Sequence, residues 1–478
     1  MTDSRAASLR NTGAAPYGRE REGGESFWTR DRVAQALASI ASGALPRGSA
    51  PLSGVGTDTR SIAPGSLFVA LAGERFDAHD FLRDAVQGGA AAVVVSRPAA
   101  AIGLGVPVYA VSDTLVALGA LANYRRRAWG PRGPVIAIAG SNGKTTTKEL
   151  TRSALASRLE VHATAGNLNN LVGVPLTLLA LPDAADVVVV ELGMNVPGEM
   201  ARLRAIAEPT ITVITCIAEE HLEGLGSLEG VMREESIALD GAQIGVVPAS
   251  QPDVTAVARG KVRRLVTAGL GEGDVCASRW GASQDGRGWL ELEGVTVRPP
   301  VPGAHNLRNA MLAMAVAREC GIPTADAARG LEGAVIPPMR MAWESLGAAT
   351  LINDAYNASP ASMRASLDVL AALEGGRQRV AVLGTMRELG AHAARLHDEV
   401  ARYALATNVD VLAAIGEMAA ALRAASPNDQ RLVLADDLEG LWPRLEPRLA
   451  RDAVVLLKAS RGVRLERLVP LLTAWATR

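Results

Sequence analysis

Residues 135–147 join an apolar run to a glycine-rich turn: Val-Ile-Ala-Ile-Ala-Gly-Ser-Asn-Gly-Lys-Thr-Thr-Thr. The five apolar residues predict a buried parallel strand, and the residues from Lys144 onward predict the first turn of a helix. A helix that begins directly after such a turn presents unpaired backbone N–H groups to phosphate oxygens. The segment therefore constrains this part of the chain to a strand, a phosphate-binding turn and a helix of an α/β layer.

This phosphate-binding loop (the P-loop, residues 140–146) predicts binding of ATP or GTP with Mg²⁺. Lys144 is expected to neutralise the β and γ oxygens, and the hydroxyl of Thr145 to hold the metal. The general pattern has glycine at the position of Ile138, so the loop is a variant. An ordinary turn with an exposed lysine would explain neither the paired threonines nor the strand. The predicted nucleotide-binding residues are Gly140, Ser141, Asn142, Gly143, Lys144, Thr145 and Thr146.

The composition indicates a globular protein of two or three domains, since the chain has 478 residues and 48% of them are apolar. Lys and Arg (49) nearly balance Asp and Glu (50), and no basic stripe is present, which argues against a nucleic-acid partner. The isolated cysteines, Cys216, Cys276 and Cys320, indicate a reducing compartment and no metal cluster. No apolar run reaches the roughly 18 residues of a membrane span, so we expect a cytoplasmic protein without membrane insertion.

Three α/β blocks follow a polar segment, residues 1–26, which lacks the apolar region of a signal peptide and is expected to be a disordered tail. Residues 27–131 alternate short apolar runs, at 67–71, 90–95 and 108–111, with helical segments. Residues 132–337 contain the P-loop strand and two more β-branched runs, 186–191 and 210–215, and their last predicted element is a helix from about His305 to Cys320, closed by Gly321. Residues 338–478 again predict a doubly wound, Rossmann-like sheet. Linkers rich in proline and glycine separate the blocks.

Polar residues follow the middle block's strands, at the edge where open α/β sheets bind ligands. Glu191 ends the second strand and is placed to coordinate Mg²⁺. His221 follows the third strand, and we prefer a functional role to a purely structural one. Asn167, Asn169 and Asn170 form either a binding site for a polar ligand or a plain turn.

Taken together, these segments resemble the Mur ligase family of ATP-dependent enzymes that form peptide bonds. The resemblance rests on the P-loop, the Asn167–Asn170 turn, Glu191-Leu-Gly, His221-Leu-Glu, residues 303–309 and residues 353–363. Within the family, the resemblance is strongest to the member that joins D-alanyl-D-alanine to UDP-N-acetylmuramoyl-tripeptide in peptidoglycan precursor synthesis. That narrower resemblance rests on residues 58–60, 64–70, 353–363, 382–384 and 388–390. The match runs in order from about residue 27 to the C-terminus.

The resemblance implies a uridine-nucleotide domain, a P-loop ATPase domain and a Rossmann-like domain that brings the dipeptide, with domain closure assembling the site. Catalysis would involve Lys144, His221 and the residue at position 235. Asn309 would contact adenine, Asp354 the ribose and Arg340 the γ-phosphate. The UDP-linked substrate would contact Thr59, Arg60, Asn167, Asn169 and Asn170, and the dipeptide would lie near Tyr356, Asn357 and Ser359.

Position 235 departs from the family pattern. The family usually has a lysine here whose carbamate, formed with CO₂, ligates a second Mg²⁺, whereas this chain has Glu235. We expect Glu235 to replace the carbamate and, with His221, to hold the second metal, which would make the activity independent of CO₂. The alternative is a helical acid with the metal function lost or relocated, and Glu234 would serve if the register slips. Other departures are Ala139, Met339, Ser359, Thr385 and Ala459.

Ser359 and Thr385 lie in the dipeptide-facing region, so the identity of the amine substrate is where the resemblance is weakest. Two alternatives remain open. One is another amino-acid ligase of the same family, such as the folylpolyglutamate type, and the other is a degenerate nucleotide-binding scaffold. We expect the protein to be a monomer.

Overall fold

The computed structural model describes residues 26–73, 76–130, 132–283 and 286–478. They form two compact units: the first extends to Trp129 and also includes Pro175–Asp183, and the second contains the rest. The predicted α/β class is confirmed, because helices alternate with mainly parallel sheets. The predicted tail, residues 1–26, lies outside the described residues except for Ser26. In the described ranges, no helix combines the length and apolar character needed to span a bilayer.

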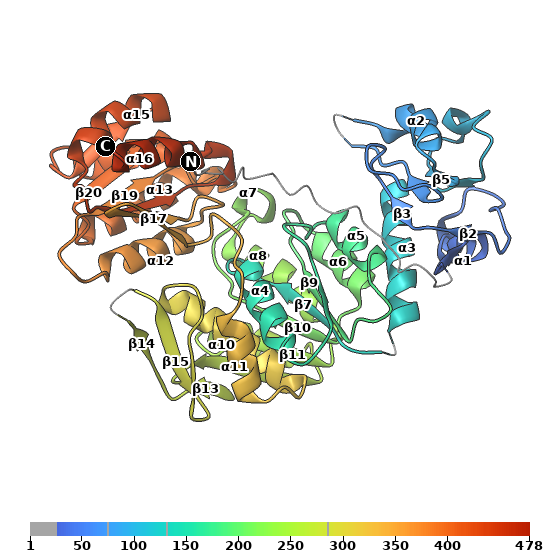
Figure 1. Cartoon of the computed structure of the whole chain (residues 1–478), viewed down its shortest axis with the longest axis horizontal. Helices are drawn as coiled ribbons and strands as arrows, with labels where there is room; N and C mark the ends of the chain where they lie inside the picture. Colours follow the sequence, from blue (N-terminus) through green and yellow to red (C-terminus); the bar gives the residue numbers. More distant parts are fainter. Residues whose placement is uncertain (1–25, 74–75, 131, 284–285) are drawn as a thin grey trace, which may run out of the picture. The chain divides into compact units, whose positions relative to one another are not determined.

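The first unit is built around a four-stranded parallel sheet, drawn in blue in Figure 1. The sheet confirms the strands predicted near residues 67, 92 and 108. Its strands are β3 (Val55–Gly56), β4 (Leu67–Val69), β5 (Ala92–Val95) and β6 (Val108–Ala110). The unit also contains the pair β1 (Trp28–Thr29) and β2 (Pro51–Leu52), helices α1 (Arg30–Ala36), α2 (Leu82–Gln87) and α3 (Thr114–Trp129), and most of α5 (Gly173–Leu179).

A seven-stranded parallel sheet in the second unit carries the P-loop. Its spatial order is β13 (Val275–Ala277), β12 (Arg264–Leu270), β11 (Ile244–Pro248), β10 (Ile211–Ile214), β7 (Val135–Ala139), β9 (Val187–Glu191) and β8 (Val161–Ala163). Every residue of β7, β9 and β10 is buried. Helices cover both faces of a sheet of this kind, so its strands carry almost continuous apolar sequence. That is the pattern from which these three strands were predicted.

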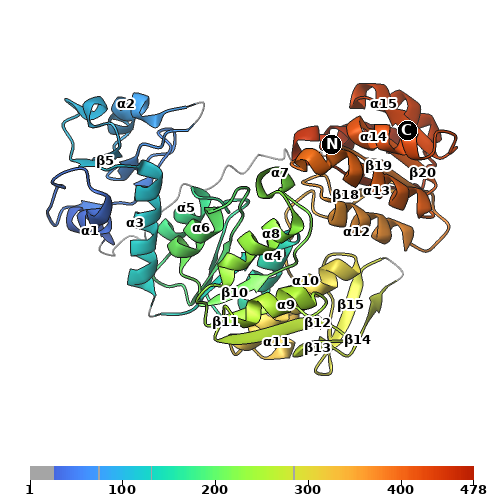
Figure 2. The ribbon, with the colours of Figure 1, turned by 180° about the vertical axis from the view of Figure 1, so that it is seen from behind.

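Helices pack on both faces of this sheet. Figure 1 shows α4 (Lys144–Leu155), α10 (Ala304–Glu319) and α11 (Thr324–Glu332), and Figure 2, from behind, shows α9 (Pro252–Arg259). The helix predicted from His305 to Cys320 is confirmed as α10, and Gly321 follows it with φ 75°. The shorter helices are α6 (Glu199–Ala207), α7 (Leu222–Leu225) and α8 (Leu228–Glu235). The antiparallel strands β14 (Arg279–Ala282), β15 (Gly288–Leu292) and β16 (Val295–Val297) were not predicted.

The C-terminal part of this unit is a six-stranded sheet with its own hydrophobic core. Its order is β17 (Ala342–Leu346), β18 (Ala349–Asn353), β22 (Val454–Lys458), β19 (Arg379–Leu383), β20 (Val411–Ile415) and β21 (Leu432–Ala435). All pairs are parallel except β17 with β18, which agrees with the predicted Rossmann-like arrangement. The helices are α12 (Pro360–Ala371), α13 (Ala393–Ala406), α14 (Gly416–Ala425), α15 (Leu438–Leu445) and α16 (Val469–Ala476).

Candidate active site

A cavity of about 500 Å³, here called the central cavity, opens at the carboxyl ends of β7, β9 and β10. Residues from the C-terminal sheet also line it. Of the residues predicted from the sequence, the cavity is lined by Ser141, Asn142, Gly143, Lys144, Thr145, Thr146, Asn169, Asn170, Glu191, His221, Asn309, Arg340, Asp354, Tyr356 and Asn357. The structure therefore brings most of the predicted nucleotide, metal and substrate residues of the second unit together.

The P-loop has little room for side chains beyond those it carries. Gly143, the residue before α4, has φ 81°, and a Cβ there would lie 2.8 Å from the side-chain amide of Asn309. Gly140 has φ 115°, and a Cβ there would lie 2.8 Å from the backbone nitrogen of Thr215. Both positions require glycine because of the left-handed backbone and the close neighbours. The loop is thus held in a conformation that exposes the first N–H groups of α4 to the cavity.

Glu191 has the surroundings expected of a metal ligand. It is 1% exposed and lines the cavity, and its Oε1 accepts a hydrogen bond of 2.8 Å from Nδ2 of Asn169. Its Oε2 is buried and accepts no hydrogen bond from the described part of the chain. A buried carboxylate oxygen left without a partner is costly unless a cation or donor arrives. Together with the hydroxyl of Thr145, this oxygen fits a hard cation such as Mg²⁺.

Lys144 lies among three buried carboxylates. Its Nζ donates to the backbone oxygens of Gly140 (2.5 Å) and Ser141 (3.2 Å) and lies 3.6 Å from Oε1 of Glu220. Burial alone would lower the pKa of this lysine, but Glu220, Glu235 and Glu191 raise it, so it stays charged. Such a cation at the base of the loop is suited to meet phosphate oxygens.

His221 is held by a residue of the C-terminal part. It has φ 49°, and its Nδ1 lies 2.5 Å from Oε2 of Glu388. Its Nε2 lies 3.8 Å from Oε2 of Glu220. Burial acts to lower the pKa of His221, but the hydrogen bond to Glu388 and the charge of Glu220 raise it overall. His221 therefore faces the central cavity with an acid on each side.

The two glutamates that end α8 differ in their contacts. Glu235 is fully buried, does not line the central cavity, and accepts a hydrogen bond of 2.7 Å from the backbone N–H of Gly140 through its Oε2. Burial raises its pKa to about 7. Glu234 points to α6, where its Oε1 accepts from the N–H groups of Gly198 (2.8 Å) and Met200 (3.1 Å). Neither side chain faces the space in which a nucleotide would lie.

The residues expected around adenosine and the γ-phosphate are fixed by neighbours. Nδ2 of Asn309 donates to Asn306 (3.1 Å), and Asp354 pairs with Lys458 (2.6 Å). The guanidinium of Arg340 lies 4.0 Å from the ring centre of Tyr356. Met339, where the family usually has glycine, adopts φ 60°, so the departure keeps the left-handed backbone with a bulkier residue.

The remaining predicted residues lie elsewhere. Ser359 caps α12, and its hydroxyl donates to Oδ1 of Asn142 at 2.9 Å, which connects the C-terminal sheet to the P-loop. Asn167 is exposed and does not line the central cavity. Thr59 and Arg60 belong to the first unit, where Arg60 pairs with Asp58 at 2.6 Å and its side chain is 87% exposed.

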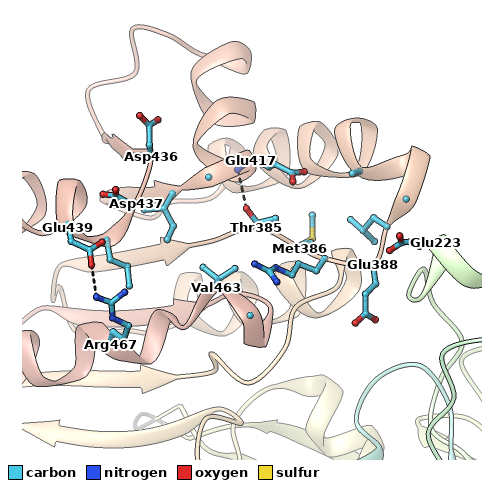
Figure 3. Close-up of a pocket in the computed structure, with 18 residues that line it drawn as sticks. Glu223, Thr385, Met386, Glu388, Glu417, Asp436, Asp437, Glu439, Val463 and Arg467 are labelled. Atoms are coloured by element: carbon cyan, nitrogen blue, oxygen red, sulfur yellow. Dashed lines mark hydrogen bonds and ion pairs between the residues drawn. The ribbon is translucent and has the colours of Figure 1, made fainter. Parts of the chain in front are cut away.

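A second cavity, of about 770 Å³, lies at the carboxyl ends of β19, β20 and β21 and is called here the C-terminal cavity (Figure 3). Arg387 and Arg467 are its cations. Arg467 pairs with Glu439 at 2.5 Å, and the hydroxyl of Thr385 accepts from the N–H of Glu417 at 3.1 Å. The acidic lining residues are Glu223, Glu388, Glu417, Asp436, Asp437 and Glu439. A cavity with both charges is suited to a small zwitterion.

Sequence reasoning missed three charged residues of these sites: Glu220, Glu388 as the partner of His221, and Lys458 as the partner of Asp354. Glu220 directly precedes His221, so the strand-end rule that singled out the histidine applied to it too. The other two contacts join segments far apart in the chain. No local pattern could have indicated them.

Models of known protein families match three consecutive parts of the chain. Residues 51–126 match the catalytic domain of the Mur ligase family, residues 138–317 the Mur ligase middle domain, and residues 339–461 the Mur ligase glutamate ligase domain. The UDP-N-acetylmuramoyl-tripeptide–D-alanyl-D-alanine ligase of Escherichia coli is 36% identical over 91% of this chain and 96% of its own length.

Two solved structures are similar to this chain over most of its length. MurF from Acinetobacter baumannii superposes with a TM-score of 0.85 at 31% identity, covering 94% of this chain and 99% of that one. MurF ligase from Thermotoga maritima in complex with ADP has a TM-score of 0.79 at 26% identity, covering 88% and 97%. The fold and the three-part order of the sequence are shared with both.

Proposed function

Because the chain belongs to the Mur ligase family, we propose that it joins D-alanyl-D-alanine to UDP-N-acetylmuramoyl-tripeptide with hydrolysis of ATP to ADP and phosphate, in peptidoglycan precursor synthesis. The observation that carries the proposal is the central cavity, in which the P-loop, Glu191, Asn309 and Asp354 line one space. We propose that the reaction takes place in the cytoplasm, where ATP is available.

The reaction has two steps. The terminal carboxylate of the tripeptide attacks the γ-phosphorus of ATP, which forms an acyl phosphate and releases ADP. The amine of the dipeptide then attacks the acyl carbon, loses a proton and displaces inorganic phosphate. Phosphoryl transfer requires positioning and neutralisation of charge more than covalent help from the protein.

The residues of the central cavity provide these two functions. The P-loop N–H groups and Lys144 bind the phosphates, while Asn309 and Asp354 orient the nucleoside. Thr145 and Glu191 would hold Mg²⁺, which, when bound, neutralises charge on the phosphate oxygens. Arg340, which lines the cavity and stacks on Tyr356, is proposed to contact the phosphoryl group in transfer.

We assign the C-terminal cavity to the dipeptide, whose ammonium and carboxylate groups match the acidic residues and arginines that line it. Glu388 supports the assignment, because it lines this cavity and also hydrogen-bonds His221, which lines the central cavity. The two spaces therefore share a boundary. In the first unit, Thr59 and Arg60 are proposed to bind the diphosphate of the UDP-linked substrate, for which the planar guanidinium of arginine is suited.

Phosphate release with each substrate omitted in turn tests this function. We expect release only when ATP, UDP-N-acetylmuramoyl-tripeptide and D-alanyl-D-alanine are all present, with one phosphate for each peptide bond. Release with glutamate and a folate substrate would support the folylpolyglutamate type instead, and binding of ATP without any release would support a scaffold. A Lys144→Ala protein with unchanged turnover would refute the assignment of the P-loop.

A further inference from the structure

Three buried carboxylates surround Lys144, and they differ in what their oxygens contact. Glu191 ends β9, Glu220 lies in the loop after β10, and Glu235 ends α8. Each has one oxygen that accepts no hydrogen bond from the described residues. Glu191 and Glu220 line the central cavity, whereas Glu235 does not.

Glu235 hydrogen-bonds the backbone at the start of the P-loop. Its Oε2 accepts the N–H of Gly140 at 2.7 Å, and the side chain is completely buried. A shift that brought this carboxylate into the cavity would break that hydrogen bond and leave a buried N–H unpaired. The carboxylate of Glu234 also points away from the cavity, because it accepts hydrogen bonds from two N–H groups at the start of α6. The replacement of lysine by glutamate at position 235 therefore leaves the cavity without an anionic group from α8.

Glu220 is a buried carboxylate that already lines the central cavity. Its side chain is 8% exposed, and its two oxygens lie 3.6 Å from Nζ of Lys144 and 3.8 Å from Nε2 of His221. Its carboxylate thus lies between two basic side chains. When Lys144 turns to the phosphates of a bound nucleotide, Glu220 loses its nearest positive charge inside a buried site. A divalent cation shared with the phosphates would restore the balance.

We propose that Glu220, next to His221, provides the carboxylate for the second Mg²⁺, and that Glu235 is a positioning residue that holds the P-loop through Gly140. The inference rests on the proposed ATP-dependent function. Among the described residues, no three His, Cys, Asp or Glu side chains already converge on a metal position. That suits Mg²⁺, which takes one or two carboxylates and completes its shell with water and substrate phosphates.

Counting bound Mn²⁺, as a spectroscopic substitute for Mg²⁺, tests the assignment without relying on turnover. Full-length protein with a non-hydrolysable ATP analogue would be titrated with Mn²⁺ while free ion is followed by electron paramagnetic resonance. Wild type and Glu235→Gln are expected to bind two ions with equal affinity. Glu220→Gln is expected to lose the second ion or bind it at least about tenfold more weakly. Glu229→Gln, an exposed change on α8, is the matched control.

The proposal would be overturned if the wild type bound only one Mn²⁺ ion. It would also be overturned if Glu220→Gln bound two Mn²⁺ ions with wild-type affinity. Loss of the second ion in Glu235→Gln would overturn it as well. Thermal unfolding without ligands checks that each variant is folded, and Glu220→Asp, which keeps the charge, should bind the second ion with intermediate affinity. Addition of bicarbonate should change neither count.

Phosphate release measured on the same wild-type preparation separates the two proposals. Ligation that requires both substrates, combined with unaltered Mn²⁺ binding in Glu220→Gln, would contradict the metal assignment alone. The expected Mn²⁺ counts without any ligation would contradict the proposed function alone.

Discussion

Glu235 carries a buried charge that the folded protein disfavours. Burial raises its pKa to about 7 from an ordinary value of 4.5. Below pH 4.5 the carboxyl is protonated in both the folded and the unfolded state, so it has no effect on stability. As the pH rises towards 7, only the unfolded state ionises freely, and the free energy of unfolding falls.

We therefore predict that Glu235→Gln stabilises the ligand-free protein above pH 7 and changes little near pH 4. The shift from 4.5 to about 7 corresponds to an upper value of about 3 kcal/mol. The glutamine oxygen can still accept the N–H of Gly140, so the loop contact is retained. Urea unfolding at pH 4.5 and pH 8 measures the difference. Equal effects of the substitution at both pH values would contradict the prediction.

Individual site residues could be predicted where a strand end fixes their place. Glu191 follows from the rule that parallel strands present their carboxyl ends at one edge, and Lys144 follows from the P-loop pattern after β7. The roles of Glu220 and Glu235 could not be separated in this way, because side-chain direction depends on local backbone. His221 adopts a left-handed conformation that turns the chain directly after Glu220. The last turn of α8 directs its two neighbouring glutamates to different partners.

At the scale of elements, helix α6 depends on an acceptor from another helix. Gly198, the residue before α6, has φ 88° and no side chain to cap it, and Glu234 of α8 accepts the N–H groups of Gly198 and Met200 instead. This carboxylate also lies at the positive end of the helix dipole.

Glu234→Ala should therefore lower the free energy of unfolding by about 1–2 kcal/mol, as expected for the loss of a helix cap. Nucleotide affinity should be unchanged, since the side chain does not line the central cavity. Thermal or urea unfolding measures the first effect and calorimetric titration the second. Glu229→Ala on the same helix is the control, because Glu229 is exposed. Equal stability of the two variants would show that α6 needs no such cap.

Fully buried strands were easier to predict from the sequence than partly exposed strands. Strands β7, β9 and β19 have continuous apolar sequence because helices cover both faces of their sheets. Strands β14 and β15 were missed because they are short, contain glycine and tryptophan, and expose part of their residues. In β15 the alternation is confined to Leu290-Glu291-Leu292, which is too short a run to identify a strand.

At the scale of the whole molecule, the sequence predicted three blocks, and the structure groups the second and third into one compact unit. Proline-rich linkers mark where blocks end, but they do not show which blocks pack together. The hydrogen bonds from His221 to Glu388 and from Ser359 to Asn142 connect the two sheets of the second unit. Both join residues more than 160 positions apart, beyond the reach of local patterns.

A ligand that binds only the folded second unit should stabilise that unit selectively. With Mg²⁺ and a non-hydrolysable ATP analogue at a concentration of a hundred times its dissociation constant, the free energy of unfolding of this unit should increase by about 2.7 kcal/mol. The first unit has its own core and should unfold as before. Differential scanning calorimetry should show one transition moving to higher temperature, and Lys144→Ala should remove most of the shift. A uniform shift of the whole profile would contradict this expectation.

The hydroxyl of Ser359 makes hydrogen bonds in two parts of the second unit. It closes the capping box at the start of α12, and it donates to Asn142 in the P-loop. A displacement of Asn142 would therefore be transmitted to the first turn of that helix. One hydroxyl thus couples the start of a helix on the C-terminal sheet to the P-loop, across 217 positions of the chain.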